Sequence, residues 1–271
     1  MIKPLDRDEL RNQVRAAVPF PYLLIDGFLD EESAERILHA YPTFEEAAKV
    51  GKSFQAVNEK GKVQVSDSRT FAAPIAALNA ALAGREFRDT LSYAFDIPDL
   101  LADDQLVGGG IHQTGARGHL DVHVDFNFIP HRQFHRRLNI LIYFNKDWQP
   151  EWGGNIELWD KDVKHCSGSF SPVFNRCVVF ETSDVSYHGV SAVKGPQGQV
   201  RKSFAAYYYT QEAPANWDGQ TRSTVFRARP DEVLKGKLFM PLEKAERQVR
   251  SVVRDFGRMV KSIVRGGRPR S

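Results

Sequence analysis

The sequence has few cysteines and no long apolar run, and both features narrow the classes of protein to which it can belong. Its 271 residues hold two cysteines, Cys166 and Cys177, which make neither a disulfide framework nor a plausible metal-binding pair. No apolar stretch approaches the roughly 18 residues of a membrane span, and residues 1–20 lack the continuous apolar segment of a secretory signal. We therefore expect reduced thiols and a cytoplasmic location.

The remaining composition is that of one large globular domain with appendages. Hydrophobic residues make up 42% and charged residues 26%, and the length is enough to bury a sizeable core. The net charge of +3 conceals an asymmetry, because residues 235–271 hold eleven Lys/Arg against three Asp/Glu, a net +8. The preceding 234 residues therefore carry about −5, so the basic character belongs to the tail.

The spacing of apolar residues is helical in the first third of the chain. Residues 19–29 are expected to form a short strand, and a helix is expected from Asp30 to about Tyr41. Pro74–Ala83 and Arg85–Phe95 have the pattern of two further helices. The polar stretch 45–70 shows no clear period and is expected to be a surface loop or weak hairpin.

From Gln105 to Thr210 the apolar spacing changes to strict alternation. Seven segments bounded by Gly, Pro, Asn or Asp are expected as strands: Leu106–Gln113, Leu120–Phe128, Arg137–Phe144, Gly154–Trp159, Cys177–Glu181, His188–Val193 and Lys202–Tyr209. This pattern predicts an α+β fold, a double-stranded β-helix (jelly-roll) barrel with the N-terminal helices packed on one side. Residues 1–104 and 105–210 are expected to form one domain, with 105–210 as its core.

Residues 211–271 are expected to be a connector followed by a basic amphipathic helix over 241–264. Such a helix can pack on the barrel, dock on a partner, or lie on an anionic membrane surface, and the pattern leaves these roles open. Oligomerisation is left open as well. Basic and aromatic residues do not interleave here, which argues against a nucleic-acid partner.

The most informative short motif is His123-Val124-Asp125, inside an alternating run. Residues i and i+2 of a strand share a face, so His123 and Asp125 can grip one metal ion from one direction. A third ligand from a distant strand would complete a two-histidine, one-carboxylate set with open positions, as in non-haem iron(II) oxygenases. Taken alone the motif is weak, because a buried histidine is more often an ordinary core residue.

Further motifs follow in order. They are Arg137–Asn145, Trp152–Leu158, Asn175–Phe180, His188-Gly189-Val190 and Arg201-Lys202-Ser203. Over about Pro19–Thr210 this ordered series resembles the iron(II)- and 2-oxoglutarate-dependent dioxygenases, specifically their prolyl 4-hydroxylase-like branch.

The resemblance implies which residues hold the metal and the cosubstrate. His123, Asp125 and His188 match the iron ligands. Arg201 matches the residue that pairs with the distal carboxylate of 2-oxoglutarate, a task that suits the bidentate and permanently charged guanidinium, and Ser203 matches a hydroxyl beside it.

Three more residues have a weaker match to cosubstrate contacts. Asn139, Tyr143 and His112 lie about where relatives place polar groups against 2-oxoglutarate, and ordinary strand polarity explains them equally well. His119 and Asp121 flank the metal motif and are expected beside the site or exposed.

For function, the resemblance implies an enzyme that hydroxylates an unactivated C–H bond and releases succinate and CO2. The cofactors implied are Fe(II), 2-oxoglutarate and O2, with ascorbate left open. The substrate is not identified and can be a small molecule, a glycan or a protein residue; the basic segment His131–Arg137 suggests an anionic group on it. The alternatives are a non-catalytic jelly-roll binding or scaffold protein and a cupin-like metalloenzyme that does not use 2-oxoglutarate.

Overall fold

The computed structural model of the chain describes residues 1–215, 217–232, 235 and 240. The helix expected over 241–264 lies outside the described residues. The chain divides into two compact units, Met1–Arg227 and Ala228–Ser271. In the described part of the second unit, Glu232 pairs with Arg229 and Lys235. Among the described residues, no helix is both long enough and apolar enough to cross a membrane.

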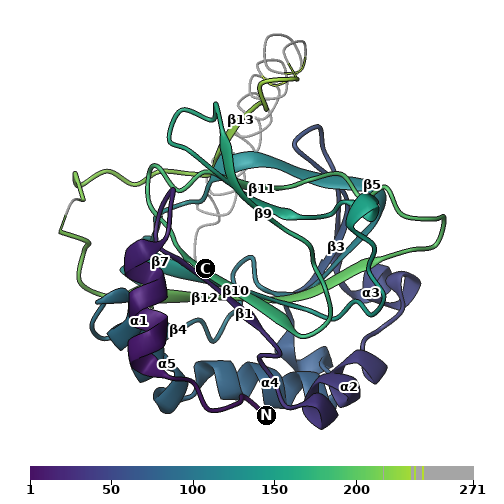
Figure 1. The fold of residues 1–271 in the computed structure, drawn as a ribbon, viewed down its shortest axis with the longest axis horizontal. Coiled ribbons are helices and arrows are strands. Elements are labelled where there is room, and N and C mark those ends of the chain that lie inside the picture. Colours follow the sequence, from purple (N-terminus) through teal and green to yellow (C-terminus); the bar gives the residue numbers. More distant parts are fainter. Residues whose placement is uncertain (216, 233–234, 236–239, 241–271) are drawn as a thin grey trace, which may run out of the picture. The chain divides into compact units, whose positions relative to one another are not determined.

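The first unit is built on one curled antiparallel sheet (Figure 1). In spatial order its main strands are β1 (Tyr22–Asp26), β10 (Arg176–Glu181), β7 (Phe134–Tyr143), β12 (Arg201–Thr210), β5 (Gly110–Val124), β11 (His188–Val190), β8 (Ile156–Trp159) and β9 (Cys166–Phe170). Short strands β4 (Leu101–Ala102), β6 (Phe128–Ile129) and β13 (Val225–Arg227) pair with β12, β7 and β5. The predicted jelly-roll barrel is confirmed.

The strand β5 joins the two halves of this sheet. Its first residues, Gly110–Thr114, pair with β12, and its later residues pair with β11. Between them the chain bends at Gly115–Gly118, where a side chain at Gly118 would meet Thr114 Cγ2 at 2.4 Å. The two strands expected at Leu106–Gln113 and Leu120–Phe128 are therefore one continuous, bent strand.

Five α-helices accompany the sheet: α1 (Arg7–Ala16), α2 (Glu31–His39), α3 (Phe44–Val50), α4 (Ala73–Ala83) and α5 (Arg85–Phe95). Helix α2 begins where the sequence predicts, because the Asp30 carboxylate accepts a hydrogen bond from the Ser33 amide at 2.8 Å. Helices α4 and α5 also match their predicted ranges, whereas α1 was not predicted.

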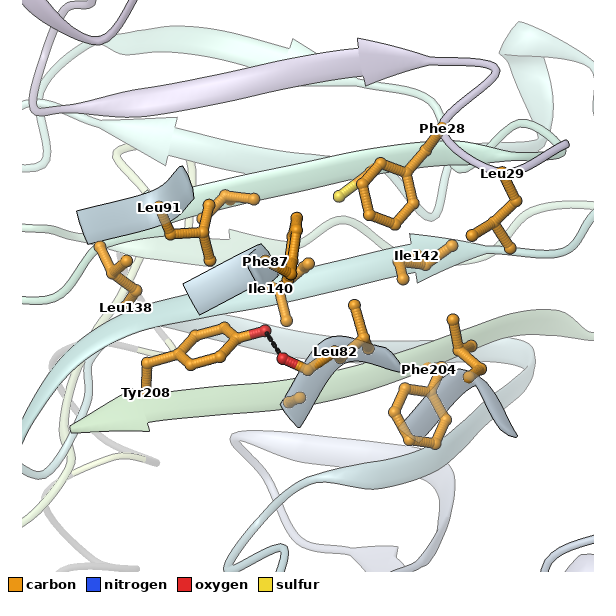
Figure 2. Close-up of a cluster of buried hydrophobic side chains, with 14 of the residues drawn as sticks. Phe28, Leu29, Leu82, Phe87, Leu91, Leu138, Ile140, Ile142, Phe204 and Tyr208 are labelled. Carbon is orange, nitrogen blue, oxygen red and sulfur yellow. Dashed lines mark hydrogen bonds between the residues drawn. The ribbon is translucent and has the colours of Figure 1, made fainter. Parts of the chain in front are cut away.

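The helices pack against one face of the sheet, as predicted. Figure 2 shows this core, where Leu82, Phe87 and Leu91 of the helices meet side chains of β7 and β12. The Tyr208 hydroxyl donates to the Leu82 carbonyl oxygen at 3.0 Å across the same contact. Alternate residues of β7 point the other way, so that Tyr143 joins a second apolar cluster inside the barrel.

The stretch 45–70 has more structure than its composition suggests. It forms the end of α3 and a hairpin of β2 (Lys52–Gln55) and β3 (Glu59–Val65). Helix α3 starts in a reciprocal capping box between Thr43 and Glu46. Strand β3 then pairs along β5, with Val63 and Val65 buried. This hairpin therefore forms part of the barrel wall.

Candidate functional site

His123, Asp125 and His188 meet inside the barrel. His123 lies at the end of β5, and His188 opens β11 directly opposite it in the antiparallel pairing. One ligand atom from each of the three residues lies within 4.8 Å of the other two. The Asp125 carboxylate faces both rings, with Oδ1 3.6 Å from His123 Nε2 and Oδ2 3.4 Å from His188 Nε2. Sheet pairing thus brings His188 beside His123 and Asp125, which lie 65 and 63 positions before it in the sequence.

Both histidines present a lone pair to this centre. His123 Nδ1 lies 2.8 Å from the Asp121 carbonyl oxygen, and His188 Nδ1 lies 2.9 Å from the Ser186 carbonyl oxygen. Because a carbonyl oxygen only accepts, each Nδ1 carries the proton and each Nε2 is left as an acceptor. Burial lowers the pKa of His188, which keeps its ring neutral at pH 7. Two nitrogen lone pairs and a carboxylate therefore face one another, an arrangement that suits a divalent cation between them.

The Asp125 carboxylate has two donors of its own. Asn139 Nδ2 donates to Oδ2 at 2.7 Å, and Arg136 Nη2 lies 3.1 Å from the same oxygen. Burial by itself would raise the pKa of Asp125, but the positive charge of Arg136 is the largest opposing cause, and that pKa is held well below its usual range. The carboxylate is therefore ionised at neutral pH.

Arg201 is the second charged group of the cavity and is 3% exposed. Its Nε donates to the Gly154 carbonyl oxygen at 2.7 Å and its Nη1 to Ser203 Oγ at 3.3 Å. Within the described part of the chain, its buried Nη2 has no hydrogen-bond partner. An unsatisfied buried donor on a cation is costly, and a carboxylate that enters the cavity would satisfy it.

Tyr143 stands beside Arg201 with a hydroxyl that likewise has no partner among the described residues. The guanidinium carbon of Arg201 lies 4.9 Å from the centre of the Tyr143 ring. Burial raises the pKa of Tyr143 to about 12, so its hydroxyl stays protonated and can donate.

The other two predicted polar residues are already engaged. The Asn139 amide donates to Asp125 and accepts from Arg136 Nε and Nη2 at 2.9 and 2.8 Å. His112 lies opposite Ser203 in the sheet and places Nε2 3.0 Å from the Gly108 carbonyl oxygen. Asn139 therefore contacts a predicted metal ligand.

All eight predicted residues except Tyr143 line one cavity. Its wall also includes residues that sequence reasoning did not assign to the site, namely Lys62, Thr114, Leu120, Arg136, Leu141, Ile156, Phe180, Val190 and Tyr207. His119 lines the cavity too, while Asp121 is fully buried beside it. Lys62 comes from the hairpin in 45–70, where the sequence carries no signal for it.

Two arginines of the basic segment His131–Arg137 take part in ion pairs. Arg132 is held by Asp103 and Asp104, each at 2.6 Å. Arg136 is 4% exposed and points into the cavity wall, where its guanidinium carbon lies 3.7 Å from the centre of the Tyr207 ring. These contacts pair both arginines with carboxylates of the chain, and an anionic group on the substrate stays a prediction.

Comparison with known proteins agrees with this geometry. Residues 109–209 match the model of the 2OG-Fe(II) oxygenase superfamily. The mouse prolyl 3-hydroxylase OGFOD1 is 33% identical over 78 residues, which cover 27% of this chain and 14% of that protein. The match thus spans only a small part of this relative's length.

Solved structures share the fold. A Pseudomonas putida prolyl-4-hydroxylase superposes with a TM-score of 0.53 at 16% identity, covering 74% of this chain and 98% of that one. A Phytophthora capsici prolyl 4-hydroxylase gives 0.53 at 17% identity, covering 98% and 93%. A Trichoplax adhaerens prolyl hydroxylase, solved with a hypoxia inducible factor peptide, gives 0.52 at 15% identity, covering 75% and 88%.

Proposed function

We propose that the chain is a member of the 2OG-Fe(II) oxygenase superfamily, in its prolyl 4-hydroxylase-like branch, and that it hydroxylates an unactivated C–H bond with 2-oxoglutarate and O2 as cosubstrates. One observation carries the proposal. Three ligand atoms converge at one end of a cavity, and a buried arginine presents an open N–H in the same cavity. All four residues lie within the matched range 109–209.

In this proposal His123, Asp125 and His188 hold iron(II). The donor set fits, because it offers two imidazole nitrogens and one ionised carboxylate within 4.8 Å of one another, the two-histidine, one-carboxylate set that leaves other coordination positions open. The chemistry that iron(II) and 2-oxoglutarate supply when bound is oxygen activation, with 2-oxoglutarate leaving as succinate and CO2.

Arg201 binds and orients the distal carboxylate of 2-oxoglutarate. Its Nε and Nη1 are committed to Gly154 and Ser203, which fixes the guanidinium plane and leaves Nη2 for the ligand. The protonated hydroxyl of Tyr143 is a second donor beside it. His112 is available only through its remaining ring nitrogen.

The apolar residues of the cavity keep water away from the reacting groups. Leu141, Ile156, Phe180 and Val190 line the wall among the polar groups. Exclusion of water strengthens the charge interactions of Asp125 and Arg201 with whatever binds there.

We extend the proposal to a prolyl residue of a peptide or protein as the first substrate to test. This rests on the relatives, since the mouse protein and the solved structures above are named as prolyl hydroxylases. Small molecules and glycans remain in the screen, with succinate release as the common readout. Two free thiols, Cys166 and Cys177, support a cytoplasmic location as part of the same proposal. Membrane or partner contact through 241–264 stays a prediction.

The test is an anaerobic titration of the full chain with iron(II) and 2-oxoglutarate. We expect a weak visible charge-transfer band in the wild type and in His131→Ala, whose histidine is exposed, and no band in His123→Ala. A band that survives in His123→Ala would refute the assignment. Iron binding without a band would favour the cupin-like alternative, and no metal binding would favour the scaffold.

A further inference from the structure

Arg136 is a buried cation that the proposed roles of the cavity leave unexplained. Its side chain is 2% exposed. The guanidinium carbon lies 3.7 Å from the centre of the Tyr207 ring and 4.6 Å from that of Phe126. A buried charge is expensive unless it is paired, and its anionic partner in the described chain is Asp125, 3.1 Å away.

Arg136, Asn139 and the Asp125 carboxylate form one connected hydrogen-bond network. Arg136 donates through Nε and Nη2 to Asn139 Oδ1, at 2.9 and 2.8 Å. That contact orients the amide, so that its nitrogen points at Asp125 Oδ2 and donates at 2.7 Å. Arg136 Nη2 approaches the same oxygen, so both donors act on one atom of the carboxylate.

An aspartate carboxylate needs such hydrogen bonds if it is to hold a single orientation. The torsion that rotates a carboxylate about its Cβ–Cγ bond is broad, so packing alone sets its orientation poorly. Here the carboxylate faces both imidazoles, with Oδ1 toward His123 and Oδ2 toward His188. Donors fixed to Oδ2 hold that orientation.

A bulge in β7 puts the two donors on the same side of the sheet. Residues 136 and 139 are three apart, so in a regular strand they would lie on opposite faces. The pairing of β7 with β12 shifts at Arg137, because Tyr208 pairs with Leu138 and Tyr209 pairs with Arg136. The unpaired residue reverses the alternation and turns Arg136 toward the cavity.

We propose that Arg136 and Asn139 are positioning residues for the metal centre, which hold the Asp125 carboxylate in the orientation that closes the three-ligand set. This rests on the proposed function, because it takes Asp125 as a metal ligand. Neither residue is assigned a contact with the metal, so their effect on metal binding passes through Asp125.

The probe is Co(II) alone, titrated into the metal-free full chain without 2-oxoglutarate, with the visible Co(II) absorption bands as readout. We expect Asn139→Ala to weaken Co(II) binding about tenfold or more and to alter the bands, since a hydrogen bond to a charged acceptor is lost. Arg136→Lys keeps the charge but loses the fork, and should weaken binding in the same direction. Because the two residues act as a unit, the double variant should lose less Co(II) affinity than the product of the two single-variant losses.

Asn145→Ala is the matched control. Asn145 is also a buried asparagine, just after β7, but its amide donates to Pro172 and Lys202 carbonyl oxygens outside the cavity. We expect it to lower the thermal midpoint yet keep the Co(II) affinity within about twofold of wild type. If Asn139→Ala does not fold, Asn139→Ser replaces it.

The outcomes separate the two proposals. Wild-type Co(II) affinity and bands in the Asn139 and Arg136 variants would overturn the positioning role and leave the oxygenase assignment standing. A wild type that binds no Co(II) would overturn both. Weakened binding in the variants, with normal binding in Asn145→Ala, supports the positioning role even if no substrate is turned over.

Discussion

The buried pair of Arg136 and Asp125 makes a prediction about stability that needs no metal. The two side chains are 2% and 12% exposed, and the atoms Nη2 and Oδ2 are 3.1 Å apart. Asp125→Ala removes the anion and leaves the guanidinium buried among Phe126, Tyr207 and Asn139. Metal-free Asp125→Ala should therefore be strongly destabilised, and a second change at Arg136 should relieve it.

The magnitude follows from the geometry. At an effective dielectric constant near 20, two unit charges 3.1 Å apart attract by about 5 kcal/mol before desolvation is counted. Removing one partner of a buried pair costs about 3–5 kcal/mol, because the other charge is left unpaired. Asn139 and the two aromatic faces still contact Arg136, so we expect the lower end, about 3 kcal/mol. Arg136→Met in the Asp125→Ala background should restore about 2 kcal/mol or more.

The assay is urea unfolding in a chelator, followed by tryptophan fluorescence, for the wild type, both single variants and the double variant. Arg137→Met is the control, because Arg137 is a neighbouring arginine whose pairing with Glu181 is looser, at 3.9 Å. The losses in unfolding free energy caused by Arg137→Met and by Asp125→Ala should add within about 0.5 kcal/mol. Additive losses for Arg136→Met and Asp125→Ala would refute the claim that these two groups stabilise each other.

Three further outcomes are expected. Arg201→Lys should weaken 2-oxoglutarate binding about tenfold or more in a titration of the charge-transfer band, because the fork held by Gly154 is lost. Adding Mn(II) at about 100 times its Kd should raise the free energy of unfolding by about 2.7 kcal/mol in wild type but not in His188→Ala. Burial depresses the pKa of His112 well below 6.5 and also lowers the pKa of His188 below 6.5, so at acidic pH the unfolded chain binds more protons than the folded chain. The free energy of unfolding of the metal-free protein should therefore fall as the pH drops below about 6.5, with a shallower slope in His112→Gln.

Much of the site could be predicted because it depends on strict strand geometry. His123 and Asp125 are two residues apart, so they project from one face of the chain whatever the surroundings. Arg201 and Ser203 follow the same rule and do contact each other, at 3.3 Å. The helices α4 and α5 were predictable because their apolar residues recur at helical spacing and face the sheet.

What the sequence did not reveal arises where alternation breaks or where pairing is non-local. Arg136 looks like a solvated residue in a basic run, and only the bulge at Arg137 turns it inward. Lys62 lies in a polar stretch without period, and its place in the wall depends on β3 pairing with β5 across about fifty residues. Local spacing carries no information about either event.

The segment that follows the family match returns to the predicted metal centre. The family match ends at residue 209, yet β13 pairs with β5 so that Phe226 lies opposite His123, their ring centres 5.3 Å apart. The approach to β13 is held by Asn127, which donates to the Gln220 carbonyl oxygen and accepts from the Arg222 amide. Because this segment packs on a predicted metal ligand and lies beyond the range of the family match, we expect substrate specificity to depend on 217–227. Exchange of these residues should change which substrate is hydroxylated while leaving Co(II) binding in place.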